Sequence, residues 1–189
     1  MKLTQAFSLA VAILFVLAPT LIHAQAIATE EHKILHHDVG TWDATVKMWM
    51  EPGAEEPMVS RGVETNRMVG DFWLVGDFEG DFQGMPMIGH SMQGYDAESG
   101  KFFGMWVDSM SDKPTKMSGT WDAESSTMSF ETSAYDPTGA PISGKMVIVY
   151  NEDGSRTMSM HYPNPENTEE WMTVMEIHYT PRDDSDGSP

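Results

Sequence analysis

Beyond Gly40 the sequence is a succession of short β patterns separated by turn residues, and this succession constrains the fold more than any other feature. In the first pattern Trp42, Ala44 and Val46 alternate with neighbours that are mainly polar, which predicts a strand with one buried face. Short segments rich in Gly, Asp and Ser follow each pattern, as in all-β sandwiches and barrels. We expect about ten strands, at 41–50, 58–69, 72–82, 87–95, 101–108, 115–121, 127–134, 142–150, 156–161 and 170–179.

Hairpins in unbroken succession favour an antiparallel up-and-down meander, and closing it into a barrel removes the exposed edges. A barrel of about ten strands is slightly wider than its own side chains fill, so we expect an interior cavity. The faces expected to point outward carry charges such as Asp77, Glu79 and Lys145. An outer-membrane barrel needs a continuous apolar band there, so that class is excluded.

A short N-terminal helix is expected before the barrel, at residues 29–39. Thr29 can cap it, Ile34, Leu35 and Val39 form a small apolar stripe, and Gly40 ends it.

Residues 1–26 have the pattern of a cleavable secretory signal peptide. A basic Met1-Lys2 start precedes an apolar run at 6–18, and Ala24-Gln25-Ala26 is an A-x-A cleavage site. An uncleaved membrane anchor is the less favoured alternative, because about 20 apolar residues are needed to cross a bilayer. We therefore predict an exported protein, periplasmic or secreted, with a single barrel domain at 27–181 and a disordered acidic tail at 182–189.

The charge and the lack of cysteine exclude several classes of partner and chemistry. The chain carries a formal charge of −18, and loss of 26 of its 189 residues leaves 163 with a charge of −19, since Lys2 is the only charged residue removed. Such a surface repels phosphate, so we expect no nucleic-acid binding and no attachment to anionic lipid once the signal is cleaved. With zero Cys, disulfides and thiol catalysis are impossible, and a core must stabilise the fold.

Several stretches together resemble a known family. Gly40-Thr41-Trp42, where the helix meets the first strand, resembles the opening of lipocalin-type barrels. A wider set of stretches lies at 32–35, 39–42, 48–53, 65–68, 84–87, 94–96, 106–110 and 119–122. In this order they resemble the exported bacterial family called domain of unknown function 1579, over roughly residues 32–180. The resemblance implies an all-β, lipocalin-like (calycin-type) barrel, and it brings no activity and no catalytic residue.

Two groups of residues are candidate metal ligands. His32 and His36 lie at i and i+4 of the expected helix, where two imidazoles can share a metal. The favoured alternative is a polar helix face across one barrel end, with His32 bonded to the backbone. Met85, Met87, His90 and Met92 offer soft ligands for copper, but Met equally suits a core or an adaptable apolar pocket. We favour the core or pocket, so no metal is assigned and the cofactor stays unknown.

The leading hypothesis is a binding module that holds a small apolar or amphipathic ligand in a cavity lined by Met, Phe and Trp. Asn66 and Arg67 are neighbours in one strand, so one of them faces inward, and which one is left open. The candidate ligand-binding residues are Trp42, Asn66, Arg67, Met87, His90, Tyr95 and Trp106.

No catalytic motif is found, and no catalytic residue is assigned. The alternatives are an enzyme using His90, His161 or Glu64 in the same cavity, or a packed barrel that acts through its surface in the cell envelope. No oligomeric state is assigned.

Overall fold

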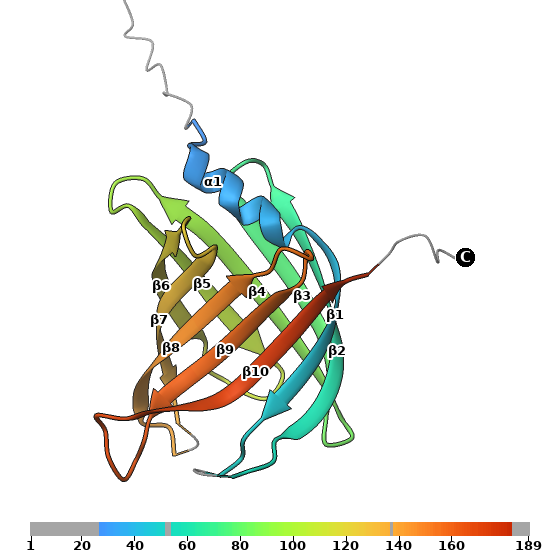
Figure 1. Cartoon of the computed structure of the whole chain (residues 1–189), viewed down its shortest axis with the longest axis vertical. Helices are drawn as coiled ribbons and strands as arrows, with labels where there is room; N and C mark the ends of the chain where they lie inside the picture. The colour runs from blue at the N-terminus through green and yellow to red at the C-terminus, as the bar shows by residue number, and fades with distance from the viewer. Residues whose placement is uncertain (1–26, 52–53, 137, 183–189) are drawn as a thin grey trace, which may run out of the picture.

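A closed antiparallel barrel of ten strands makes up most of the computed structural model, which describes residues 27–51, 54–136 and 138–182 (Figure 1). Each strand pairs with its neighbours in sequence, and β10 pairs with β1 to close the ring. The predicted all-β, up-and-down barrel is confirmed. The strands are β1 (Gly40–Met48), β2 (Met58–Val69), β3 (Trp73–Phe82), β4 (Met85–Asp96), β5 (Lys101–Asp108), β6 (Thr115–Asp122), β7 (Thr127–Tyr135), β8 (Pro141–Tyr150), β9 (Arg156–Pro163) and β10 (Trp171–Pro181).

Strand boundaries differ from expectation mainly at one end of the barrel. β1 ends at Met48 rather than residue 50, because the register of β10 shifts between Thr173 and Met175 and the Trp49 amide donates to the Val174 carbonyl there, at 3.0 Å. β4 begins two residues early, where Met85 pairs with Phe82. The expected signal peptide, the turn residues 52–53 and residues 183–189 of the expected tail lie outside the described residues.

The N-terminal segment is helical as expected, but it changes type along its length. An α-helix, α1 (Glu30–Ile34), continues as a 3₁₀ turn, η1 (Leu35–Asp38). Thr29 and His32 form a capping box, in which the Thr29 amide donates to Nδ1 of His32 at 3.1 Å. In the described part of the chain, no helix has the length and apolar character needed to span a bilayer.

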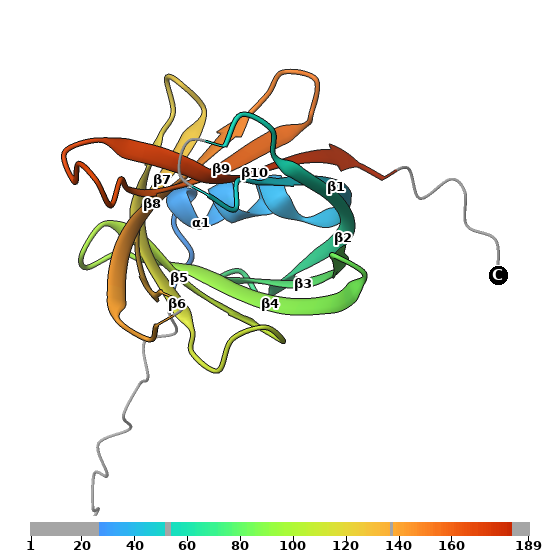
Figure 2. The same ribbon diagram turned by 90° about the horizontal axis from the view of Figure 1, so that it is seen from below.

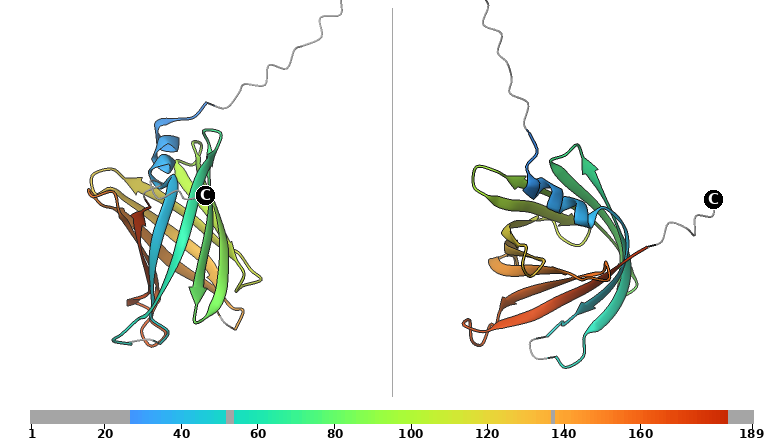
Figure 3. Two further views of the ribbon diagram at one scale, coloured as in Figure 1. Left: turned by 90° about the vertical axis from the view of Figure 1, so that its right-hand side faces the viewer. Right: turned by 45° about the horizontal axis from the view of Figure 1, so that its top comes forward.

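This helical segment lies across one end of the barrel, as the view along the barrel shows (Figure 2). The His32 ring packs edge-on against Phe72 and Tyr95, while the His37 ring packs against Trp121 and Tyr150 on another part of the rim. The turns between β2 and β3, β4 and β5, β6 and β7, and β8 and β9 lie at this end, and the other four hairpin loops and the β9–β10 connection lie at the opposite end (Figure 3). We call these the closed end and the loop end.

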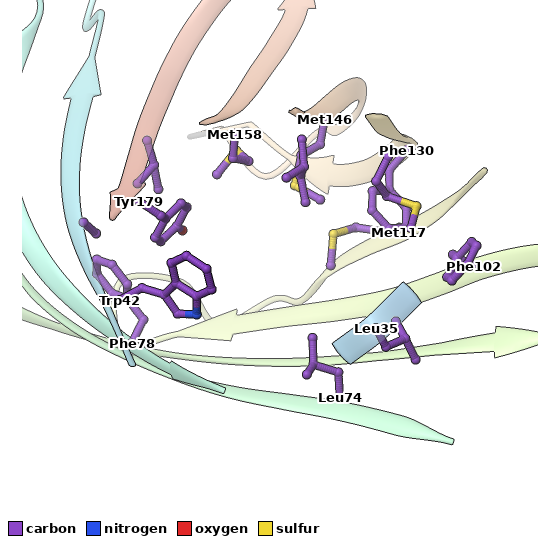
Figure 4. Close-up of a cluster of buried hydrophobic side chains, with 14 of the residues drawn as sticks. Leu35, Trp42, Leu74, Phe78, Phe102, Met117, Phe130, Met146, Met158 and Tyr179 are labelled. Carbon is purple, nitrogen blue, oxygen red and sulfur yellow. The ribbon is translucent and has the colours of Figure 1, made fainter. Parts of the chain in front are cut away.

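The inner faces of the strands supply the hydrophobic core. Its buried members include Trp42, Leu74, Phe78, Phe130 and Met146, whose side chains point into the barrel (Figure 4). Aromatic rings lie close to the wall because glycines on adjacent strands make room for them. A Cβ added at Gly89 would lie 2.2 Å from the ring of Trp106, and one at Gly62 would lie 2.3 Å from that of Phe78. Rings held against the wall leave the middle of the barrel open.

Candidate functional site

The interior holds a cavity of about 560 Å³ that extends from the closed end to the loop end. Met110 and Tyr135 line it at the loop end, and because both are about half exposed, the cavity reaches solvent there. Most of its wall is apolar, with rings from Phe78 and Trp106. Eight methionines contribute to the lining: Met48, Met87, Met110, Met117, Met146, Met158, Met160 and Met175.

A buried arginine forms the polar floor of the cavity at the closed end. Arg156, the first residue of β9, is only 4% exposed through its side chain. Its guanidinium lies 4.1 Å from the centre of the Trp42 ring and 4.3 Å from that of Tyr179, which favours the cation through the ring quadrupoles. Its Nε lies 3.0 Å from Oδ1 of Asp38, and its Nη2 donates to Oε1 of Glu64. Two carboxylates therefore share one cation.

Asp38 ties the helical segment to the barrel through both its side chain and its backbone. The Tyr150 hydroxyl donates to Oδ2 of Asp38 at 2.8 Å. The Asp38 carbonyl accepts hydrogen bonds from Nε1 of Trp42 at 2.9 Å and from Nδ2 of Asn66 at 3.0 Å. A buried ion pair stabilises only when its remaining groups are also hydrogen-bonded. These bonds satisfy Oδ2 and the carbonyl of Asp38, whereas Oδ1 has no hydrogen-bond partner among the described residues and only the ion-pair contact with Nε of Arg156.

Burial and charge shift the acid–base properties of this cluster. Burial raises the pKa of Glu64 above its usual value, while Arg156 and the hydrogen bond from Asn66, 2.6 Å long, act in the opposite direction. Burial, followed by the charge of Asp38, raises the pKa of Tyr150 well above its ordinary value. Burial, followed by the charge of Glu64, does the same for the pKa of Tyr179. Both phenols are therefore neutral donors near neutral pH.

Glu64→Gln tests the direction of the Glu64 shift. Because the pKa is raised in the folded state, the stability it contributes is complete below the unfolded value of about 4.5 and is lost as the pH rises through the folded pKa. The free energy of unfolding of Glu64→Gln should therefore increase relative to wild type between pH 4.5 and pH 8, measured by urea unfolding. Glu79→Gln, which removes an exposed carboxylate from β3, corrects for the loss of one negative charge. A difference between Glu64→Gln and wild type that stays constant or falls over this range contradicts the shift.

The structure separates the seven candidate ligand-binding residues into three groups. Asn66, Met87 and Trp106 line the cavity. Trp42 is buried over the Arg156 guanidinium, and Tyr95 packs against His32 at the closed end. Arg67 and His90 are exposed on the outer face, where Nδ1 of His90 lies 2.6 Å from Asp77. Of the neighbours Asn66 and Arg67, Asn66 is therefore the one that faces inward.

The residues proposed for an enzyme do not converge. Glu64 lines the cavity, but His90 and His161 lie on outer faces, His161 within hydrogen-bond distance of Ser159 and Thr173. The copper candidates are also divided, since Met87 lines the cavity while Met92 is exposed beside His90.

His32 is buried within the capping box, and His36 is exposed. Throughout residues 27–51, 54–136 and 138–182, no three His, Asp or Glu side chains are grouped to hold a metal ion.

Arg156 and Tyr150 were not singled out from the sequence, and the pairing of Arg156 with Asp38 was not predicted. One signal pointed to Arg156: it shares its strand face with Met158 and Met160, and all three line the cavity. A charged residue on an apolar strand face is expected to be buried with a partner. Its partner Asp38 lies in the helical segment, far away in sequence, so strand alternation alone does not identify the pair.

Comparison with known proteins places the chain by family and not by activity. The family model described as "Protein of unknown function (DUF1579)" matches residues 28–181. No curated protein matches. Among solved structures, the chain is similar to a redesigned beta barrel, with 11% sequence identity, a TM-score of 0.39, and coverage of 79% of this chain and 96% of that one.

Proposed function

The chain belongs to the DUF1579 family of proteins of unknown function, and we propose that its barrel is a binding module for a small, largely apolar molecule held in the interior cavity. The observation that carries this proposal is the cavity of about 560 Å³, whose wall is Met-rich and whose floor is polar. Ligand pockets typically occupy about 300–1,000 Å³, with apolar walls and a few placed polar groups. Methionine side chains are flexible and polarizable, so such a wall adapts to the shape of its ligand.

The cavity weighs against the other two functions considered. A barrel that acts only through its surface has no need of an open interior, although exposed apolar side chains do lie on the outer faces of β3, β4 and β5, among them Trp73, Met92 and Met105. An enzyme needs reacting groups that meet in the cavity, and of His90, His161 and Glu64 only Glu64 is there. Binding without catalysis fits the geometry best.

Ser60→Trp tests whether the cavity is the binding site. Ser60 lines the cavity on β2, so an indole at this position fills space that a ligand needs. We expect Ser60→Trp to weaken binding of the neutral apolar dye Nile red by about tenfold or more, since partial loss of the contact surface costs over 1.4 kcal/mol. Fluorescence titration measures the affinity.

The matched control is Val59→Trp, which places the same ring on the outer face of the neighbouring residue, already 61% exposed. It should bind the dye as wild type does. Equal weakening in both variants, or none in either, contradicts binding in the cavity. Native mass spectrometry of protein from its own host then identifies what is bound, and protein that is always free of ligand argues against the proposal.

We also propose that the binding module is exported after cleavage behind Ala26, on the basis of the signal-like residues 1–26. The expected result is that protein isolated from its host begins at Ile27 and is found outside the cytoplasm. Intact-mass measurement on fractionated cells gives both results at once. Full-length protein in the cytoplasmic fraction contradicts export.

A further inference from the structure

One nitrogen of the cavity floor has no hydrogen-bond acceptor among the described residues. Nε of Arg156 faces Asp38 and Nη2 donates to Glu64, but Nη1 is buried without a partner. A guanidinium carries five N–H donors in a fixed plane, two of them on Nη1. Burying a charged donor without an acceptor costs free energy, so this side chain is suited to a ligand that supplies one.

The position of Arg156 connects this donor to the cavity. Arg156, Asp38, Glu64 and Asn66 all line it, and they gather at the end opposite the solvent opening. A ligand that enters from the loop end therefore meets an apolar wall first and the polar floor last. This order suits an elongated apolar molecule with one polar group at its leading end.

The charges around the donor select the kind of polar group. Asp38 and Glu64 already flank the single Arg156 cation, so the three groups together carry a net negative charge when all are ionised. A ligand carboxylate would add a third negative charge beside one cation, in a protein whose formal charge is −18. A neutral oxygen accepts from Nη1 without that repulsion.

We propose that the closed end of the cavity recognises the uncharged oxygen acceptor of an apolar ligand, a hydroxyl or a carbonyl, through Nη1 of Arg156. This inference rests on the proposed binding function and specifies its ligand class. It predicts discrimination among molecules that share one apolar chain and differ only at the end.

The test is a displacement titration with a matched series: dodecan-1-ol, dodecan-2-one, dodecanoate and dodecane, each competing with Nile red in the full-length mature protein. Wild type should bind the alcohol and the ketone about tenfold or more tighter than dodecanoate and dodecane, because a hydrogen bond to a charged donor is among the strong ones. Arg156→Lys keeps the cation but lacks the planar fork, and it should lose this preference while still binding the dye. Arg67→Lys, the same exchange on the outer face, should keep it.

If Arg156→Lys does not fold, two further measurements test recognition by Nη1 of Arg156. Glu64→Gln removes one negative charge beside Arg156, so the preference for alcohol over dodecanoate should shrink by about tenfold or more. In NMR spectra of the four arginines, the Nη resonances of Arg156 should shift on addition of dodecan-1-ol and not of dodecane.

The outcomes separate this inference from the proposed function. Dodecanoate binding as tightly as the alcohol overturns the inference. Equal affinity for alcohol and dodecane also overturns it, since Nη1 is then satisfied by water alone. In both cases ligand binding itself stands. Failure of Nile red and every member of the series to bind overturns both proposals.

Discussion

Arg156→Met is expected to lower the free energy of unfolding by about 3–5 kcal/mol, the cost of leaving buried charges without their partner. Arg156 is the cation beside both Asp38 and Glu64, and its side chain is almost completely buried. Methionine fills much of the same volume and packs against Trp42 and Tyr179. The loss of stability therefore reflects the two carboxylates left without their cation more than an unfilled space. Urea unfolding followed by tryptophan fluorescence measures it.

The triple variant Arg156→Met, Asp38→Asn, Glu64→Gln is the matched control. It removes the two carboxylates along with the cation while keeping amide oxygens and N–H groups at both positions. Because a buried ion cluster as a whole is often no more stabilising than neutral residues of the same shape, this variant should regain more than half of the stability lost in Arg156→Met. A triple variant no more stable than Arg156→Met, or a single variant that loses less than about 1 kcal/mol, contradicts the proposed role of the shared cation.

The barrel could be predicted from the sequence because each strand is recognisable from its own alternating pattern and from the turn residues beside it. β2 and β5 occupy the residues expected for them, since turn residues limit both ends. In β10, alternation predicts Thr173, Met175, Ile177 and Tyr179 on the inner face and Glu176 and His178 on the outer face. The structure agrees from Met175 onward, with Glu176 bound to Lys47 on the outer face. Thr173 is exposed instead, because the register shifts between Thr173 and Met175.

The inner face of β4 was harder to predict, for a physical reason. Apolar residues fall at both odd and even positions, Met87 and Ile88 being neighbours, so alternation does not say which face is buried. The structure resolves this through Gly89, which is buried beneath the ring of Trp106. That arrangement directs Met87 inward and His90 outward. Contact with an aromatic ring on the neighbouring strand, which alternation does not report, sets the face.

The polar floor was only partly predictable because it depends on register and on the end of the helical segment. Asn66 faces the floor because it pairs with Gly40, which follows Asp38 by two residues. Arg156 lies at the same depth in the barrel because it is the first residue of β9 and pairs with Tyr179 of β10. Alternation within one strand predicts which way a side chain points. Its depth in the barrel depends on how that strand pairs with its neighbours, and this register is set only when the barrel closes.

Leu35→Ala is expected to destabilise the protein by about 2–5 kcal/mol, the usual cost of truncating a fully buried leucine. Leu35 is 1% exposed and enters the barrel near Leu74, itself 1% exposed (Figure 4). A helix as short as α1, five residues long, is not stable without tertiary contacts. Leu35 makes an apolar contact and Asp38 a polar one that hold the helical segment over the barrel end, beside the ring contacts of His32 and His37. Thermal and urea unfolding measure the loss.

The same variant separates closure of the barrel end from general stability. Loosening the helical segment exposes the polar floor to water. Relative to wild type, Leu35→Ala should therefore accelerate solvent exchange more at the backbone amides of residues 30–39 than at those of β7, which is remote from this segment in sequence. Val39→Ala, at a side chain 41% exposed in the next turn of the chain, should change stability by less than about 0.5 kcal/mol. If exchange in Leu35→Ala accelerates equally in β7 and in the helical segment, the segment is not a separate closure, and the barrel with its helix unfolds as one unit.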